Sequence, residues 1–223
     1  LMLYSILEIE DDGIKEKLAV SCDNQPFIAR APLVLIFLAD YERWMDVFAA
    51  SGVPALREER GASMRRPGEG DLMLACCDAL IAAQTAVIAA ESLGLGSCYI
   101  GDIMERHAYH QELLDLPRYT FPISMVCFGY PRPDGPERPL TSRFPQACIH
   151  FKDGYRRLED EDLLEMVKSR KRGPFTEGAA NVGQQVYARK FSSDYAREMT
   201  RSVRQAMRAW TAEGGEDEGR GPF

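Results

Sequence analysis

The sequence predicts a domain that combines α-helices and β-strands, of either the α/β or the α+β class. Residues 32–39 are apolar on both faces of a strand, and residues 72–93 carry apolar side chains at helical spacing. A strand that is apolar on both faces is typical of a sheet covered by helices on both sides. We therefore expect a layered fold, although periodicity alone does not separate the two classes.

The first half of the chain divides into strands, helices and one long connection. The predicted elements are a strand over residues 1–9, a helix from Asp12 through Ala19, a strand over 32–39 and a helix over 40–50. Residues 51–70 contain prolines and glycines without any period, and we interpret them as a mobile lid or linker. Because Leu1 already lies inside a strand-like run, we expect that an N-terminal segment is missing.

The second half of the chain contains the longest predicted helix. The predicted elements are this central helix over 72–93, a short strand over 97–101, a helix over 107–116, a buried strand over 121–130 and helices over 160–171 and 193–212. The proline-rich residues 131–145 should be irregular. Residues 213–223 are acidic and glycine-rich, so we expect a disordered tail. We thus expect one domain over residues 1–212.

Composition limits the classes of partner. The formal net charge is −7, and no run of Lys and Arg is long enough to follow a phosphate backbone, so we expect no nucleic acid. We also expect no membrane span, because the apolar run 31–39 is much shorter than the roughly 20 residues that cross a bilayer. Six cysteines without a C-x-x-C pair favour a soluble protein in the reducing cytoplasm.

One segment carries a family resemblance. A helix rich in small residues ends at Gly94, the motif GLG follows at residues 94–96, and a short strand then stops at Gly101. This helix-GLG-strand-Gly pattern resembles the signature of the nitroreductase family of FMN-dependent NAD(P)H oxidoreductases. The resemblance implies an α+β fold with a mixed, mostly antiparallel sheet wrapped by helices. It also implies a homodimer with the long central helices at the interface.

The resemblance assigns cofactor-binding roles at the end of that strand. It implies that the main-chain N–H of Asp102 faces the hydride-accepting nitrogen of the flavin, with Gly101 and Ile100 against the ring and Tyr99 beside them. The alternative reading from the residues alone is a strand end followed by Asp102 as the N-cap of a helix that begins at Ile103.

Other positions match the family pattern in part. Gln25 matches a glutamine that contacts the flavin, although before Pro26 it could simply form a turn. Arg143 occupies the place of a phosphate-binding basic residue, where the alternative is a solvated charge. Thr141 replaces the lysine of that pattern. Met2 stands where relatives carry a glutamine, and it could offer the ring only an apolar contact.

The sequence predicts no catalytic side chain and no metal site. His107 and His110 lie at i, i+3, but no further ligands cluster with them, so we interpret both as exposed helix histidines. Cys76 and Cys77 lie inside the central helix, and we expect them to pack rather than react.

The resemblance implies an FMN-dependent oxidoreductase that uses NAD(P)H to reduce nitroaromatics, quinones or flavins by ping-pong hydride transfer. The protein would orient the cofactor, and an aromatic or quinone acceptor would take the electrons. Two alternatives stay open. One is a relative with another flavin reaction, such as dehalogenation. The other is a catalytically silent flavin-binding dimer, favoured by the departures at Met2 and Thr141.

Overall fold

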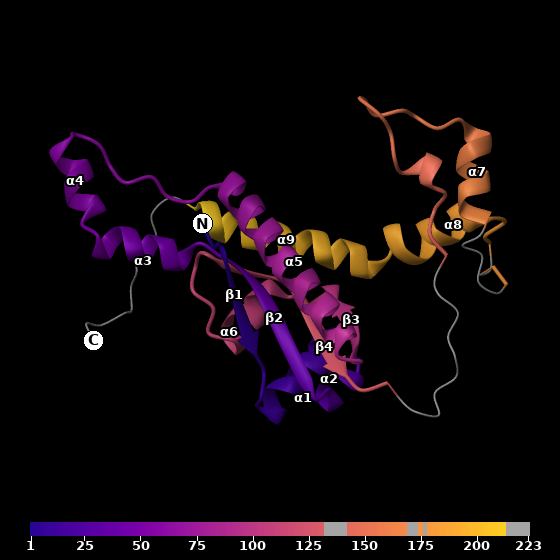
Figure 1. The fold of residues 1–223 in the computed structure, drawn as a ribbon, viewed down its shortest axis with the longest axis horizontal. Helices are drawn as coiled ribbons and strands as arrows, with labels where there is room; N and C mark the ends of the chain where they lie inside the picture. Colours follow the sequence, from indigo (N-terminus) through magenta and orange to yellow (C-terminus); the bar gives the residue numbers. More distant parts are fainter. Residues whose placement is uncertain (132–141, 169–173, 176–177, 213–223) are drawn as a thin grey trace. The chain divides into compact units, whose positions relative to one another are not determined.

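The computed structural model describes residues 1–131, 142–168, 174–175 and 178–212. The chain forms two compact units (Figure 1). Unit 1 comprises Leu1–Arg132 and Glu198–Phe223, and unit 2 comprises Pro133–Arg197. Thr141, part of the proline-rich stretch and the predicted acidic tail lie outside the described residues.

A four-stranded sheet forms the centre of unit 1 (Figure 1). Its strands, in spatial order, are β1 (Tyr4–Glu8), β2 (Leu33–Asp40), β4 (Thr120–Gly129) and β3 (Gly96–Ile100). Every described pair of strands is antiparallel, which agrees with the mostly antiparallel sheet that we expected. β2, which was predicted to be apolar on both faces, and β4, which was predicted to be buried, lie in the middle, where both of their faces can be covered.

Two short helices cover one face of the sheet. They are α1 (Asp12–Ser21) and α2 (Phe27–Arg30), and Asp11 caps α1 by accepting a hydrogen bond from the Ile14 N–H at 2.7 Å. Alternate residues of a strand point to the same face, so the even positions of β2, together with Met125 and Cys127 of β4, meet these helices. The core on this face includes Leu18, Ile28, Val34, Ile36, Met125 and Cys127.

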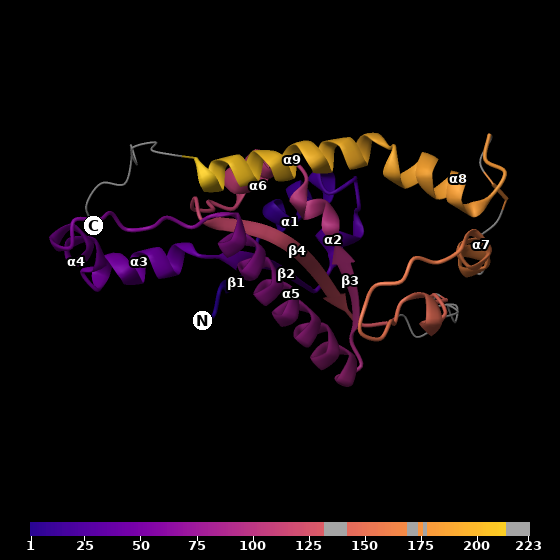
Figure 2. The same cartoon turned by 90° about the horizontal axis from the view of Figure 1, so that it is seen from above.

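The long helix α5 (Glu69–Ser92) covers the opposite face of the sheet (Figure 2). It packs through small side chains, which allow the helix to approach the strands closely. The core on this face includes Phe37, Ala79, Ala83, Ala90, Val126 and Phe128. Each large apolar side chain buried in this way contributes about 2 kcal/mol to folding. The predicted covering of the sheet on both faces is confirmed.

α5 differs from our expectation in one respect. It has 24 residues, and by length and composition it could cross a membrane, whereas we expected no apolar segment of that size. Only 17% of its most apolar window is buried inside the structure, although core helices of soluble proteins pass the same test. Its contacts with β2 and β4 identify α5 as a core helix that leaves much of an apolar surface uncovered.

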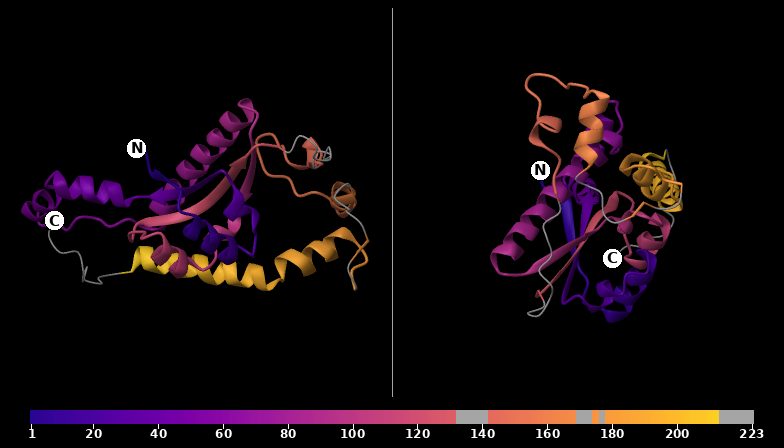
Figure 3. Two further views of the ribbon diagram at one scale, coloured as in Figure 1. Left: turned by 90° about the horizontal axis from the view of Figure 1, so that it is seen from below. Right: turned by 90° about the vertical axis from the view of Figure 1, so that its right-hand side faces the viewer.

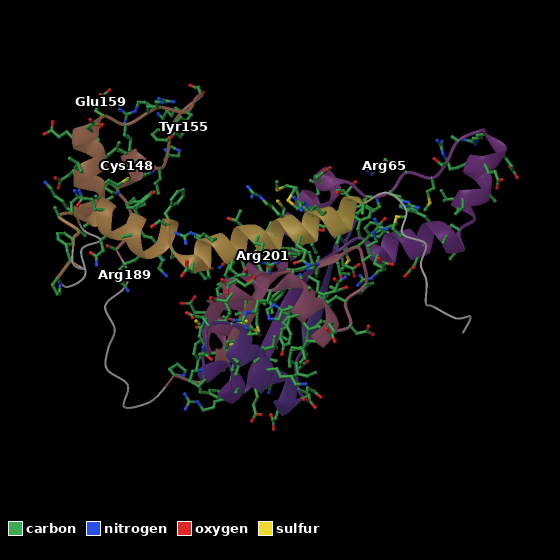
Figure 4. The ribbon with its side chains drawn as sticks, turned by 180° about the vertical axis from the view of Figure 1, so that it is seen from behind. Arg65, Cys148, Tyr155, Glu159, Arg189 and Arg201 are labelled. Carbon is green, nitrogen blue, oxygen red and sulfur yellow. The ribbon has the colours of Figure 1, made fainter. Side chains whose placement is uncertain are left out.

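The connection between β2 and α5 contains more structure than we expected. After α3 (Glu42–Ala50), a second helix, α4 (Val53–Glu59), occupies part of the stretch that has no period in the sequence. Gly52 adopts a left-handed φ of 73° and a proline follows in the first turn, which together start this short helix. Arg65 then forms a bidentate ion pair with Asp71 at the start of α5 (Figure 4).

On the α1 side of the sheet, η1 (Gly101–Met104) and α6 (His107–Leu113) pack against α9 (Asp194–Thr211), which belongs to unit 1 from Glu198 onward (Figures 2 and 3). The Ser202 hydroxyl accepts a hydrogen bond from the His107 N–H at 2.8 Å and donates one to the Met104 carbonyl at 2.7 Å. This serine therefore fastens α9 to the turn that follows β3.

Unit 2 consists of short elements. They are η2 (Gln146–Cys148), α7 (Asp160–Lys168), α8 (Val182–Val186) and η3 (Tyr187–Phe191), the last being a π-helical turn. The rings of Phe151 and Tyr155 lie 5.5 Å apart (Tyr155 is labelled in Figure 4), and Arg156 lies 6.0 Å from the Phe151 ring. α7 and the start of α9 confirm the predicted helices, although residues 169–171 lie outside the described residues.

Candidate functional site

The candidate site is the junction of β3 and η1, formed by Ile100, Gly101 and Asp102. Ile100 is buried and has extended backbone angles, and the 3₁₀ turn η1 begins at Gly101 directly after it. Asp102 therefore lies within the first turn of η1 and is not the N-cap of a helix that begins at Ile103, which was our alternative reading. The opening N–H groups of such a turn have no partner within it, so they are directed toward the end of the strand.

Gln25 reaches this junction from the end of α1. Asp23 and Asn24 adopt left-handed φ angles of 60° and 50°. The Gln25 N–H then donates a hydrogen bond to the Ala19 carbonyl at 2.8 Å. Asn and Asp tolerate that conformation better than other side chains do. The tight turn fixes Gln25, and its Nε2 donates to the Cys22 carbonyl at 2.9 Å and to Asp102 Oδ2 at 3.2 Å. Two of the predicted site residues are thus in direct contact.

This contact limits what Gln25 can offer a ligand. Both N–H bonds of its amide group point to protein acceptors, so only its carbonyl oxygen is available for an external partner. A ligand at this junction would therefore have to present an N–H or O–H donor to Gln25. Main-chain N–H groups at the start of η1 would in turn suit an acceptor atom of the same ligand.

Tyr99 lies on the other side of the sheet from Gln25. Successive residues of a strand point to opposite faces, and the Tyr99 hydroxyl lies 3.3 Å from Oε1 of Gln84 on α5. Ile100 packs with α1 and α2 instead. The structure therefore brings together Gln25, Ile100 and Asp102, with Tyr99 on the α5 side of the same strand.

Of the two remaining predicted contacts, only Met2 lies in the same unit as the junction, and it is not brought to the junction within one copy of the chain. Arg143 is exposed and belongs to unit 2, so its role stays a prediction. The Met2 carbonyl accepts a hydrogen bond from Trp44 Nε1 at 3.3 Å, at the far end of β2 from Ile36. Since Ile36 and Ile100 both pair with Met125, Met2 lies about 17 Å along the sheet from the junction.

The carboxylates and thiols of the junction lie in a partly dry environment. Burial raises the pKa of Glu105, and the neighbouring Asp102 carboxylate raises it further. Burial also raises the pKa of the Cys22 thiol to about 12, so this cysteine stays protonated at neutral pH. The Asp102 carboxylate of this environment is the one that the Gln25 amide contacts.

The histidines near the junction are buried, contrary to our prediction of exposed side chains. His110 Nε2 lies 2.8 Å from the Ser21 hydroxyl, and its Nδ1 lies 2.9 Å from the Ile103 carbonyl. His107 packs against Phe121, with ring centroids 5.7 Å apart, and its Nδ1 has no hydrogen-bond partner in the described part of the chain. Burial lowers the pKa of both imidazoles. Their burial was not predictable from the i, i+3 spacing, because Ser202 on α9, which contacts His107, and Ser21 on α1, which contacts His110, are distant in sequence.

A cavity of about 330 Å³ lies under the connection between β2 and α5. Its walls are mainly apolar, and its lining residues are Tyr41, Met45, Phe48, Val53, Arg57, Met64, Arg65 and Pro67. The Tyr41 N–H donates a hydrogen bond to the carbonyl of Tyr119, directly before β4. Ile100 pairs with Met125 farther along that strand. The cavity therefore lies about 20 Å from the junction within one copy of the chain.

Comparisons with known proteins agree with the resemblance in the sequence. Residues 7–130 match the sequence model of the nitroreductase family. The chain is 31% identical over 166 residues to an FMN reductase [NAD(P)H] of Bacillus subtilis, and 32% identical over 164 residues to an oxygen-insensitive NADPH nitroreductase of Salmonella typhimurium. Each alignment covers 74% of this chain and 61% of the relative, so the chain spans about three fifths of their length.

The fold agrees with a solved structure as well. The structure of NfrA2 of B. megaterium is 30% identical in sequence to this chain and superimposes with a TM-score of 0.66. The match covers 90% of this chain and 80% of that one. The similarity therefore extends beyond the junction to most of the chain.

Proposed function

The chain belongs to the nitroreductase family, and on that premise we propose that it is an FMN-dependent oxidoreductase that uses NAD(P)H as electron donor. The observation that carries the proposal is the junction of β3 and η1, where Gln25 and Asp102 meet beside the backbone of Ile100 and Gly101. FMN, when bound, accepts a hydride from NAD(P)H and passes two electrons to a second substrate.

The donor and acceptor groups of the junction suit a flavin ring. The Gln25 carbonyl oxygen would accept a hydrogen bond from the N–H of the pyrimidine part of the ring. The main-chain N–H of Asp102 would donate to the ring nitrogen that takes up hydride. Gly101, which has no side chain, would allow the ring to lie against the backbone. These residues bind and orient the cofactor, whereas the cofactor supplies the redox chemistry.

The phosphate of the cofactor needs a cation, and we propose Arg143 for that role. It is an exposed arginine two residues after Thr141, which stands where the family pattern has a lysine. Arginine can bind a phosphate through two parallel N–H···O bonds, which suits a site that lacks the lysine.

We propose that the active form is a homodimer formed through the outer face of α5. Met73, Leu74, Ile81 and Ile88 on this helix are between 60% and 68% exposed, which leaves a long apolar strip uncovered in one copy. Strips of this kind are typical of interfaces between subunits. The distance of Met2 from the junction is consistent with a site drawn from two copies. The cavity beneath residues 51–70 lies about 20 Å from the junction of the same copy. As a lid, these residues would therefore cover the site of the second copy.

The acceptor and the compartment remain part of the proposal. We propose that an aromatic or quinone compound, such as a nitroaromatic, takes the electrons in the cytoplasm. All six cysteines are free thiols, as expected in a reducing compartment.

The visible absorption spectrum of the full chain, reconstituted with FMN, tests this function. We expect a bound flavin whose absorption is bleached by NAD(P)H and restored by a quinone or nitroaromatic. Protein that fails to retain FMN would contradict the proposal. Retained flavin without NAD(P)H oxidation would instead favour the silent flavin-binding dimer, and turnover of a halogenated substrate alone would favour dehalogenation.

A further inference from the structure

Two thiols face each other across the strand pair that leads into the junction. Cys98 on β3 stands directly opposite Cys127 on β4 in the register of the sheet. Residues that stand opposite each other in an antiparallel pair project their side chains to the same face. Cys127 is 5% exposed and packs in the core beneath α1, whereas Cys98 is exposed on the outermost strand. One thiol is therefore accessible from solvent and its neighbour is not.

The backbone pairing sets the distance between these two cysteines. The Val34 carbonyl accepts a hydrogen bond from the Ile9 N–H at 3.0 Å, so the main-chain polar groups of Val34 face β1. Cys127, which stands opposite Val34, must turn its own polar groups away from β2 and toward β3. Cys98 and Cys127 thus form a hydrogen-bonded pair, in which the Cα atoms lie about 5.5 Å apart.

This separation suits a disulfide. Cystine residues in proteins have Cα atoms roughly 4.4 to 6.8 Å apart. The Cβ atoms of a cystine are somewhat closer together than those of an ordinary hydrogen-bonded pair of residues. β3 and β4 must therefore shift by about 1 Å when the disulfide forms. β3 can make this shift because, among the described strands, only β4 pairs with it.

The surroundings of the two thiols also reflect their closeness. Burial raises the pKa of Cys127 to about 12, and the Cys98 thiol contributes to this increase. Burial raises the pKa of Cys98, and the Asp102 carboxylate raises it further. Since only the thiolate attacks a disulfide, both cysteines should react slowly near neutral pH and faster at higher pH.

We propose that Cys98 and Cys127 form a reversible redox site that reacts with small disulfides such as oxidised glutathione. The Cys98 thiolate attacks the small disulfide, forms a mixed disulfide and releases one thiolate. The Cys127 thiolate then attacks the Cys98 sulfur and displaces the second thiolate. The two protein thiols are oxidised to one disulfide, the small disulfide is reduced to two thiols, and the two protons pass to solvent or to the released thiolates.

The bond would link β3 covalently to β4 two residues before Ile100. It would therefore fix the strand end at the junction, while the strain of closing the gap makes the bond easy to reduce. Transient disulfides are the kind found in reducing compartments. The proposal is independent of flavin binding, because it depends only on the strand register and the two thiols.

Thiol titration and mass spectrometry of the full chain test the proposal. After incubation with oxidised glutathione at about pH 8.5, we expect a loss of two thiols per chain and a chymotryptic fragment in which Cys98 is linked to Cys127. Dithiothreitol should restore both thiols. Glutathione retained on Cys98 with Cys127 free would overturn the proposal, as would a link between two copies or no reaction at either cysteine.

Three variants sharpen the result. Cys98→Ser changes an exposed position and should abolish the link without unfolding the protein. Cys127→Ala should trap the mixed disulfide on Cys98, because the second attacking thiol is absent. Cys77→Ser is the control, since Cys77 is exposed in one copy of the chain but lies on α5, and it should leave the Cys98–Cys127 link intact. A link that persists in Cys98→Ser, or that disappears in Cys77→Ser, would contradict the assignment.

Discussion

Gln25 and Asp102 lie 77 residues apart in the sequence and meet through one hydrogen bond of 3.2 Å. This contact commits the amide group of Gln25 to the protein and leaves its carbonyl oxygen for a ligand. It also holds the first residues of η1 in place next to Gly101. At the scale of single residues, the candidate site is thus a short stretch of backbone held by one side chain.

Gly101→Val tests that stretch of backbone directly. The described glycines with a left-handed backbone are Gly52, Gly61, Gly94 and Gly178, so valine can adopt the conformation of Gly101. We expect the variant to keep its fold but to lose FMN, because the new side chain would occupy the space against which the ring lies. Circular dichroism and flavin absorbance after gel filtration measure the two properties.

A control for this variant is Gly70→Ala. An added Cβ at Gly70 would have no atom within 4 Å, so this substitution should leave both the fold and the flavin content unchanged. A normal flavin content in Gly101→Val would refute the placement of the ring.

At the scale of elements, the connection from η1 through α6 to α9 depends on buried polar groups. Ser202 links α9 to both His107 and Met104, while His110 joins α6 to Ser21 at the end of α1. These contacts join elements on the α1 side of the sheet. Because the imidazoles are buried, packing of these elements favours their neutral form.

The stability of the protein should therefore depend on pH. Burial lowers the pKa of His107 and His110 in the folded state below the ordinary value of about 6.5, so protons bind more readily to the unfolded chain. The stabilising contribution is complete above pH 6.5 and decreases as the pH falls below it. Urea unfolding at pH 7.5 and 5.5 should give a lower free energy of unfolding at the acidic pH.

His107→Leu separates this effect from general acid denaturation. It removes one titrating group and the buried Nδ1 that lacks a partner among the described residues. We expect an increase of about 1 kcal/mol in the free energy of unfolding at neutral pH and a smaller loss at pH 5.5. An unchanged pH dependence would show that His107 does not contribute.

At the scale of the whole molecule, the outer face of α5 is the feature that one copy of the chain leaves incomplete. The helix buries small residues against β2 and β4 and exposes large apolar ones on its other side. Water disfavours such a surface by an amount proportional to its apolar area. A second copy that covers it would explain why so apolar a helix lies at the edge of unit 1.

Ile81→Glu tests the proposed dimer. A charge placed in the middle of the buried interface would cost several kcal/mol of association free energy, so sedimentation velocity should detect a shift from dimer to monomer. Val20→Glu is a matched control, because Val20 is 61% exposed on α1, away from the α5 face. An Ile81→Glu protein that remains dimeric would contradict the proposed interface.

The sequence by itself determined most of the elements, because apolar periodicity is a local property of the chain. Residues 32–39 and 121–130 predicted the central strands β2 and β4, and the glycines at 94, 96 and 101 marked the short strand β3. α4 was not predicted, because a helix of seven residues is too short to display a clear period.

Only the tertiary structure decided which distant residues meet. Three features depend on packing between segments far apart in the chain. They are the contact of Gln25 with Asp102, the burial of His107 and His110, and the register that sets Cys98 opposite Cys127. A sequence pattern describes the faces of each element but not its partner. The partner is fixed by the fit of complementary apolar surfaces, and that fit is a property of the whole fold.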